Sequence, residues 1–192
     1  MAIKSRKELL EYIKADRLRY GYSLKTYIIG RIFSSENSRA IRLLNALRVT
    51  EYWHYRRNTN IYCKIRYAIS KLIYSRLACK YDTYIAINTC GPGLWMPHMG
   101  GIVVNCRSMG SNCSITKGVV IGNRAGQDNI ATIGDNCYFT LGCKVIGNIT
   151  IGDNVIVAQN AVVTKDVESN TLVGGIPAKP IKKYKSISEI KI

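Results

Sequence analysis

The chain contains few acidic residues and no long apolar run. Only 12 Asp and Glu stand against 28 Lys and Arg, which gives a formal net charge of +16. No apolar stretch approaches the roughly 20 residues needed to cross a bilayer, so we expect no membrane-spanning helix. The N-terminus carries basic residues without an apolar stretch behind them. We therefore expect no signal peptide and predict a cytoplasmic protein, free or at the inner face of the membrane.

Histidine is scarce and the cysteines are not paired in sequence. The two histidines have no ligand-type neighbours, so we expect no metal site. The seven cysteines are an odd number without a CxxC pair, and we expect them to be small buried hydrophobic residues without disulfides. They are Cys63, Cys79, Cys90, Cys106, Cys113, Cys137 and Cys143.

The positive charge is concentrated in the first 80 residues. This segment has 18 Lys and Arg against 5 Asp and Glu, whereas residues 81–192 have 10 against 7. The basic residues alternate with Tyr, Leu and Ile at helical spacing. Two interpretations stay open, a solvated helix face and contact of the basic helices with an anionic membrane surface. We do not expect nucleic acid as a partner.

Residues 1–80 show the three-to-four spacing of amphipathic helices. The pattern predicts helices over 5–19, 38–50 and 61–80, with Asn37 or Ser38 as the cap of the second. We expect residues 1–80 to form an α-helical region.

After residue 84 the spacing changes to a period of six. A large apolar residue recurs at every sixth position except 127, and a small or aliphatic one mostly follows four residues later. Neither an α-helix nor a simple strand has this period, which is typical of a β-helix built from short strands and tight turns. The anchors expected to point inward are Val103, Met109, Ile115, Ile121, Ile133, Phe139, Val145, Ile151, Val157 and Val163.

The turns of the expected β-helix contain glycine and asparagine at fixed places. We expect both residue types to adopt left-handed backbone geometry there. The polar segment 123–131 should loop out in part, because the anchors on either side stay in phase. The β-helix should cover 81–172, with a C-terminal cap and tail over 173–192. The residues in question are Gly110, Gly122, Gly134, Gly152, Asn112, Asn136, Asn148, Asn154 and Asn160.

Three stretches carry a resemblance to a known family. They are GLWMPHMGGIVVN (93–105), the repeats over 133–167 and the tail GGIPAKPIKKY (174–184), and EYIKADRLRYG (11–21) is similar to the segment before the repeats. The chain resembles hexapeptide-repeat acyltransferases of the serine acetyltransferase-like branch, closest to capsule and exopolysaccharide O-acetyltransferases. The resemblance implies a left-handed parallel β-helix and a homotrimer. It also implies acetyl-CoA as co-substrate in a groove between subunits, and no metal or tightly bound cofactor.

The resemblance also implies a catalytic base. His98 matches the catalytic histidine of the family, and a neutral imidazole suits removal of a hydroxyl proton near pH 7. In serine acetyltransferases the preceding residue is Asp, whereas here it is Pro97. The carboxylate that orients the imidazole falls near Thr83, so we expect the adjacent Asp82 to take that role.

The same likeness assigns the CoA contacts. Leu141 and Gln159 would offer backbone groups to the pantetheine arm. Thr164 and Lys165 would lie near adenine, and Lys179 and Lys182 near the phosphates. For these lysines, a solvated basic tail is the alternative.

The acceptor is the least determined part of the reaction. Serine acetyltransferases carry a second histidine beside an arginine in the loop that here reads NRAGQDN (123–129), without histidine. This absence favours a sugar or polysaccharide hydroxyl as acceptor, with Arg124 or Asp128 lining its site. The alternatives are L-serine O-acetylation and a non-catalytic β-helix scaffold.

Overall fold

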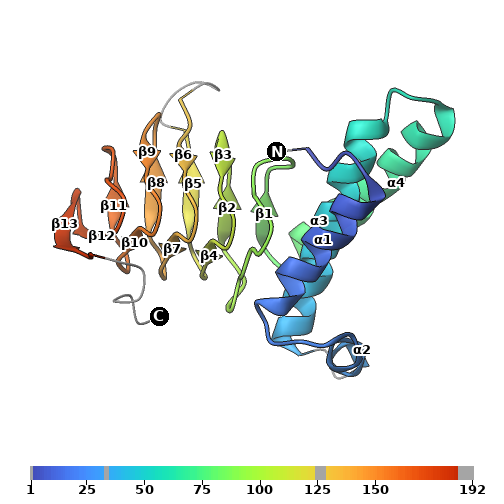
Figure 1. Ribbon diagram of the computed structural model, residues 1–192, viewed down its shortest axis with the longest axis horizontal. Helices are drawn as coiled ribbons and strands as arrows, with labels where there is room; N and C mark the ends of the chain where they lie inside the picture. The colour runs from blue at the N-terminus through green and yellow to red at the C-terminus, as the bar shows by residue number, and fades with distance from the viewer. Residues whose placement is uncertain (1, 33–34, 124–128, 186–192) are drawn as a thin grey trace.

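The computed structural model describes residues 2–32, 35–123 and 129–185. Four helices gather at one end of the molecule and a β-helix extends away from them, ending in the strands β12 and β13 (Figure 1). The chain therefore runs from the helical end to the far end of the β-helix, one coil after another.

The helices are α1 (Arg6–Leu18), α2 (Leu24–Ile32), α3 (Glu36–Arg56) and α4 (Ile61–Lys80). The amide of Glu8 bonds the side chain of Ser5, which caps α1, and Asn60 caps α4 in the same way. The cap of α3 is Ser35, so this helix starts before the segment expected from the sequence and also continues past it. The sequence analysis missed α2 altogether.

The β-helix consists of three sheets with parallel neighbours. Their orders are β1-β2-β5-β8-β11, β13-β12-β10-β7-β4 and β3-β6-β9, and only β13 runs antiparallel to its neighbour. The predicted fold is confirmed, a left-handed parallel β-helix preceded by an α-helical region. The strands are β1 (Thr83–Ile85), β2 (Ile102–Val104), β3 (Ser108–Met109), β4 (Ser114–Ile115), β5 (Val120–Gly122), β6 (Thr132–Ile133), β7 (Tyr138–Phe139), β8 (Lys144–Ile146), β9 (Thr150–Ile151), β10 (Ile156–Val157), β11 (Val162–Val163), β12 (Thr171–Gly175) and β13 (Ala178–Lys183).

The register shows how long each coil is. Thr132 pairs with Thr150, eighteen positions later, so a regular coil holds three hexapeptides. Ser114 pairs with Tyr138, twenty-four positions later, so the coil that contains 123–131 has one extra hexapeptide. The strands on both sides stay in register, and the extra residues fall between β5 and β6.

The interior is formed by the six-residue anchors. From Met109 to Val163 each of the nine is at most 3% exposed. Val103 is the exception, with 41% exposure, and the prediction for it is wrong. Val104 pairs with Ile121, seventeen positions later, so the second coil, which begins at β2, is one residue short, and the inward residues of β2 are Ile102 and Val104.

The turn residues divide into two groups with different constraints. Asn112, Asn136, Asn154 and Asn160 have φ between 55° and 57°, as expected, whereas Asn148 does not adopt positive φ. The predicted left-handed geometry is also wrong for Gly110, Gly122, Gly134 and Gly152. At Gly110 the requirement is space, because a Cβ there would lie 2.2 Å from Asp135 Oδ1.

Six of the seven cysteines are buried, as predicted, and Cys79 is exposed near the end of α4. All seven are free thiols. Burial raises the pKa of Cys90 to about 12. Such a thiol stays protonated near pH 7 and acts as a packing residue.

Within 2–32, 35–123 and 129–185, no helix is long and apolar enough to cross a membrane. The same residues hold no group of three or more His, Cys, Asp or Glu side chains that could bind a metal ion.

Candidate functional site

A buried ionic cluster joins the helices to the first coil of the β-helix. Arg48 of α3 is fully buried, and its Nε donates to Asp16 Oδ2 of α1 at 2.8 Å and its Nη1 to Glu51 Oε2 at 3.1 Å. The guanidinium also donates to the carbonyls of Cys90 and Gly91, at 2.8 and 2.7 Å. The coulombic effect of Asp16 raises the pKa of Arg48 against the desolvation that would lower it.

The helices also hold the chain that leads to His98. Asp16 Oδ1 accepts hydrogen bonds from the amides of Gly93 and Leu94, at 2.8 and 2.9 Å. The hydroxyl of Tyr20 accepts from the amide of Met96 at 2.9 Å. These bonds fix the backbone up to two residues before His98, so the helical region positions the candidate base.

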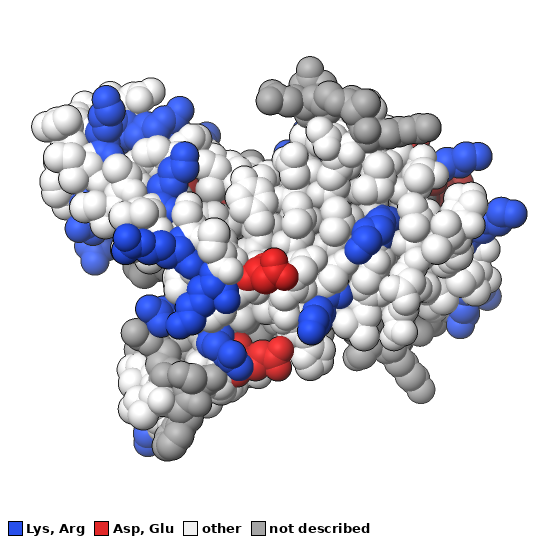
Figure 2. All heavy atoms as spheres, turned by 180° about the vertical axis from the view of Figure 1, so that it is seen from behind, with Lys and Arg blue, Asp and Glu red and all other residues white. Residues whose placement is uncertain are grey.

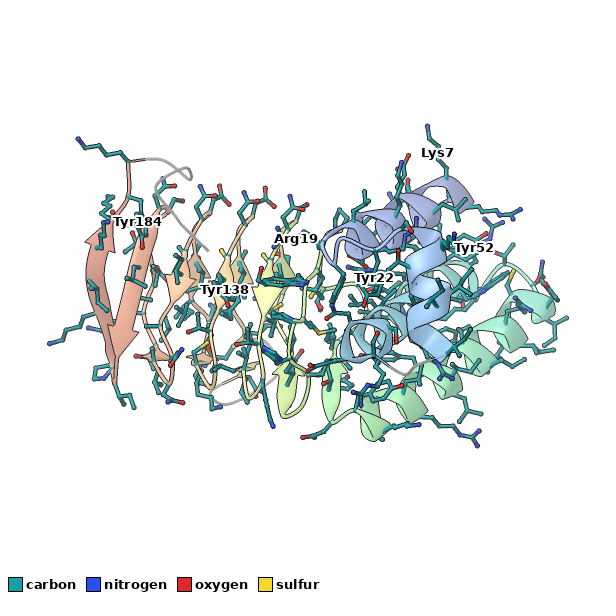
Figure 3. The ribbon with its side chains drawn as sticks, turned by 90° about the horizontal axis from the view of Figure 1, so that it is seen from below. Lys7, Arg19, Tyr22, Tyr52, Tyr138 and Tyr184 are labelled. Atoms are coloured by element: carbon teal, nitrogen blue, oxygen red, sulfur yellow. The ribbon has the colours of Figure 1, made fainter. Side chains whose placement is uncertain are left out.

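Arg19 makes a further link at this junction (Figure 3). Its Nη2 donates to Ser114 Oγ at 2.8 Å, and its guanidinium lies over the ring of Trp95 at 5.7 Å from the centroid. Ser114 belongs to β4, so α1 contacts the second coil as well as the first.

His98 lies in the turn before β2 with 63% of its side chain exposed. Its Nδ1 is 3.4 Å from Oε1 of Glu36, the first residue of α3. When Nδ1 carries the proton, it donates to this carboxylate and Nε2 keeps a free lone pair. The imidazole thus faces solvent at the boundary between the helices and the β-helix.

Asp82 and Thr83, on the strand side of His98, bond the backbone after it. Asp82 Oδ2 accepts from the amide of Gly101 at 2.7 Å, and Thr83 Oγ1 accepts from the amide of Gly100 at 3.2 Å. Asp82 itself has a φ of 47°. In the described part of the chain it forms no hydrogen bond to His98, whose carboxylate partner is Glu36.

A hollow of about 240 Å³ is lined by two neighbours of His98, Met99 and Glu36, but not by His98 itself. Two carboxylates and two cations line it, and they come from α3 and from the end of α4 with the residues after it. Side chains of both charges therefore face the same space. The lining residues are Glu36, Arg39, Lys80, Tyr81, Asp82 and Met99.

The turn that carries His98 is the first of a column of turns. The amide of Gly118 bonds the carbonyl of Gly100, the amide of Gly142 bonds that of Lys117, and the amide of Asn160 bonds that of Leu141. Leu141 and Gln159 therefore lie on the same corner of the prism as the loop after His98. Both side chains are exposed.

The other residues expected to bind CoA lie elsewhere. Thr164 and Lys165 follow β11, on the next corner of the coil, and Lys179 and Lys182 are exposed on β13. Lys165 lines a cavity of about 290 Å³ between the coil and β13, together with Lys183, which pairs with Glu168. Of the six, only Lys165 lines this cavity.

Arg124 and Asp128, which were expected to line the acceptor site, lie outside the described residues.

Three other residues near His98 were not predicted from the sequence. Glu36, Arg39 and Lys80 were missed because they have the pattern of exposed charges on helices. Their only signal is position, since Glu36 begins α3 and Lys80 ends α4.

Comparison with known proteins gives a consistent likeness. Serine acetyltransferase from Staphylococcus xylosus is 35% identical over 129 residues, which cover 64% of this chain and 58% of that protein. The chain thus spans somewhat over half the length of this curated relative. No family model matches the chain.

Two solved structures share the fold. The crystal structure of serine acetyltransferase from Brucella abortus strain S19 has a TM-score of 0.70 at 24% identity, covering 93% of this chain and 70% of that one. A serine acetyltransferase in complex with CoA has a TM-score of 0.65 at 20% identity, covering 92% and 71%.

These matches correct one expectation. A sugar or polysaccharide acceptor and a closest likeness to capsule and exopolysaccharide enzymes were predicted from the sequence, whereas the curated and structural relatives are serine acetyltransferases. The absent second histidine was given too much weight, because other residues can line an acceptor site. In sequence and in fold, the chain is serine acetyltransferase-like, with the hexapeptide-repeat β-helix of those proteins.

Proposed function

We propose that the chain transfers the acetyl group of acetyl-CoA to the hydroxyl of L-serine. The observation that carries the proposal is the 35% identity to a serine acetyltransferase over 129 residues. The chain also has a histidine, His98, that faces solvent near a small hollow lined by charged side chains. Under this proposal the acceptor enters from the hollow and the thioester from the column of turns.

His98 acts as the general base. Its Nε2 takes the proton of the serine hydroxyl as the oxygen attacks the thioester carbonyl, and the C–S bond then breaks. The thiolate of CoA leaves with the proton that His98 returns, so the base is regenerated. Glu36 holds the imidazole by accepting from Nδ1, and Asp82 holds the loop through Gly101. General base catalysis of this kind contributes roughly 10²–10⁴ in rate.

The thioester arm lies along the column that contains Leu141 and Gln159. The carbonyl of Leu141 already accepts from the amide of Asn160, so the amides of pantetheine would bond the other backbone groups exposed at these turns. Thr164 and Lys165 then face the adenine end, and Lys179 and Lys182 supply positive charge for the phosphates. One solved neighbour is a complex with CoA, which supports this choice of co-substrate.

Two further partners belong to the proposal. A homotrimer would bring the dispersed CoA residues of one subunit next to the His98 turn of another. The basic helices would also suit an anionic membrane surface, since Lys and Arg gather at the helical end while Asp and Glu are sparse there (Figure 2).

The test is release of free CoA from acetyl-CoA with L-serine, measured for the wild type and for His98→Ala. We expect a loss of at least a hundredfold in kcat for the variant. His54→Ala removes the other imidazole and is the control, with kcat within about twofold of the wild type. Unchanged turnover in His98→Ala contradicts the assignment of the base, and no CoA release with L-serine in the wild type contradicts the acceptor.

A further inference from the structure

The hollow beside His98 presents both signs of charge to one small space. Arg39 comes from α3 and Lys80 from the end of α4, while Asp82 is the second residue after α4. Resting on the proposed function, we propose that this hollow recognises the acceptor as a zwitterion. Arg39 and Lys80 bind the α-carboxylate of an amino acid, Asp82 binds its ammonium group, and the side-chain hydroxyl points to His98.

The two cations are available for an anionic ligand. Neither Arg39 nor Lys80 forms an ion pair with any described residue, and both side chains are exposed. A guanidinium offers parallel N–H donors that match the two oxygens of a carboxylate, and an ammonium adds a point charge beside it. An α-carboxylate therefore finds two partners from two helices.

One oxygen of the Asp82 carboxylate is hydrogen-bonded, and the side chain is held in a fixed direction. Oδ2 accepts from the amide of Gly101 at 2.7 Å, and among the described residues Oδ1 accepts no hydrogen bond. The left-handed backbone at φ 47° and the bond to Gly101 fix the direction of this side chain. A free oxygen held in this way is suited to an ammonium group that must lie in one place.

The hollow is also near the candidate base. Glu36 lines it and contacts His98 Nδ1 at 3.4 Å, and Met99 lines it directly after His98 in the chain. A space of about 240 Å³ is large enough for an amino acid.

The experiment compares L-serine with two analogues that each lack one charge. Ethanolamine has no carboxylate and 3-hydroxypropionate has no ammonium group, and both keep the primary hydroxyl. For Arg39→Gln and Lys80→Gln we expect KM for L-serine to rise about tenfold or more with kcat within about threefold, because each change removes a charge-assisted contact. KM for ethanolamine should stay unchanged in both variants.

Asp82→Asn should raise KM for L-serine while leaving KM for 3-hydroxypropionate unchanged. Arg42→Gln is the matched control, since it removes one exposed positive charge from the same helix outside the hollow and should leave every KM unchanged. An equal effect of Arg42→Gln, or unchanged KM for L-serine in Arg39→Gln and Lys80→Gln, overturns the inference.

Binding of L-serine measured by saturation-transfer NMR separates this inference from the proposed function. L-serine that binds without CoA release, and binds more weakly to Arg39→Gln, supports the zwitterion site while the proposed reaction fails. Turnover with unchanged KM in the variants supports the reaction and refutes the site. Neither binding nor turnover in the wild type refutes both.

Discussion

Replacement of Arg48 by Met should destabilise the protein strongly. Arg48 is fully buried and neutralises two carboxylates, those of Asp16 and Glu51, which are each 1% exposed. Met fills a similar volume without charge, so Arg48→Met leaves both carboxylates buried without a counter-ion. It also removes the donors to the carbonyls of Cys90 and Gly91.

Breaking a buried ion pair by removing one partner costs about 3–5 kcal/mol. For a chain of this size, 1 kcal/mol of stability corresponds to about 2–4 °C in Tm, so the Tm of Arg48→Met should be about 6–20 °C lower than that of the wild type. The triple variant Arg48→Met, Asp16→Asn, Glu51→Gln should recover much of this loss, because it buries no uncompensated charge. An Asn at position 16 still offers an oxygen to the amides of Gly93 and Leu94.

The assay is urea unfolding followed by circular dichroism, with all variants at one protein concentration because any oligomer shifts apparent stability by mass action. Arg42→Met, an exposed site on the same helix, is the control and should change the free energy of unfolding by about 0.5 kcal/mol or less. A loss below about 1 kcal/mol in Arg48→Met would refute the reasoning. So would a triple variant less stable than the single one.

Three further predictions concern pH and the turns. Burial and the nearby Arg57 and Lys71 lower the pKa of His54, so its contribution to stability is present above the pKa of the unfolded state and is lost as pH falls through the lowered value. The free energy of unfolding should therefore drop from pH 7.5 to pH 5. A drop of equal size in His54→Gln would exclude this cause. Asn154→Ala should be less stable than Asn154→Gly by about 1 kcal/mol, because both lose the side-chain bonds to neighbouring coils but only Ala is strained at a φ of 57°; equal urea midpoints would contradict it. Gly110→Ala should cost about 1–3 kcal/mol, whereas Gly122→Ala, whose added Cβ meets no atom of the described residues within 4 Å, should cost well under 1 kcal/mol. Thermal melts that rank the two variants the other way would show that space is not the constraint.

Periodicity predicted the β-helix because each coil repeats the same environment. Phe139 and Val145 obey the six-residue phase since each pairs with a residue eighteen positions later, whereas Val103 breaks it where the second coil is one residue short. Left-handed geometry was predicted correctly for Asn112 and wrongly for Gly110. Both residues occur at turns, and sequence alone does not separate a positive φ from a close contact between coils.

The candidate site was less predictable for a physical reason. His98 was identified through a motif, but its carboxylate neighbour Glu36 lies 62 residues earlier in the chain. The contact exists only because the Arg48 cluster docks α3 against the first coil, and no local pattern encodes that docking. Long-range charge pairs between a helical region and a β-helix are set by packing, which the spacing of residues does not reveal.

The column of turns from Gly100 to Gln159 sets a fixed distance along the axis of the β-helix. Neighbouring strands in a sheet are about 4.8 Å apart, so the three steps through Lys117 and Leu141 to Gln159 separate the ends by about 14 Å. The number of coils therefore sets how far a group held at the Gln159 level stands from His98. The six extra residues between β5 and β6 add no step to this stack, because β5 and β8 are still direct neighbours.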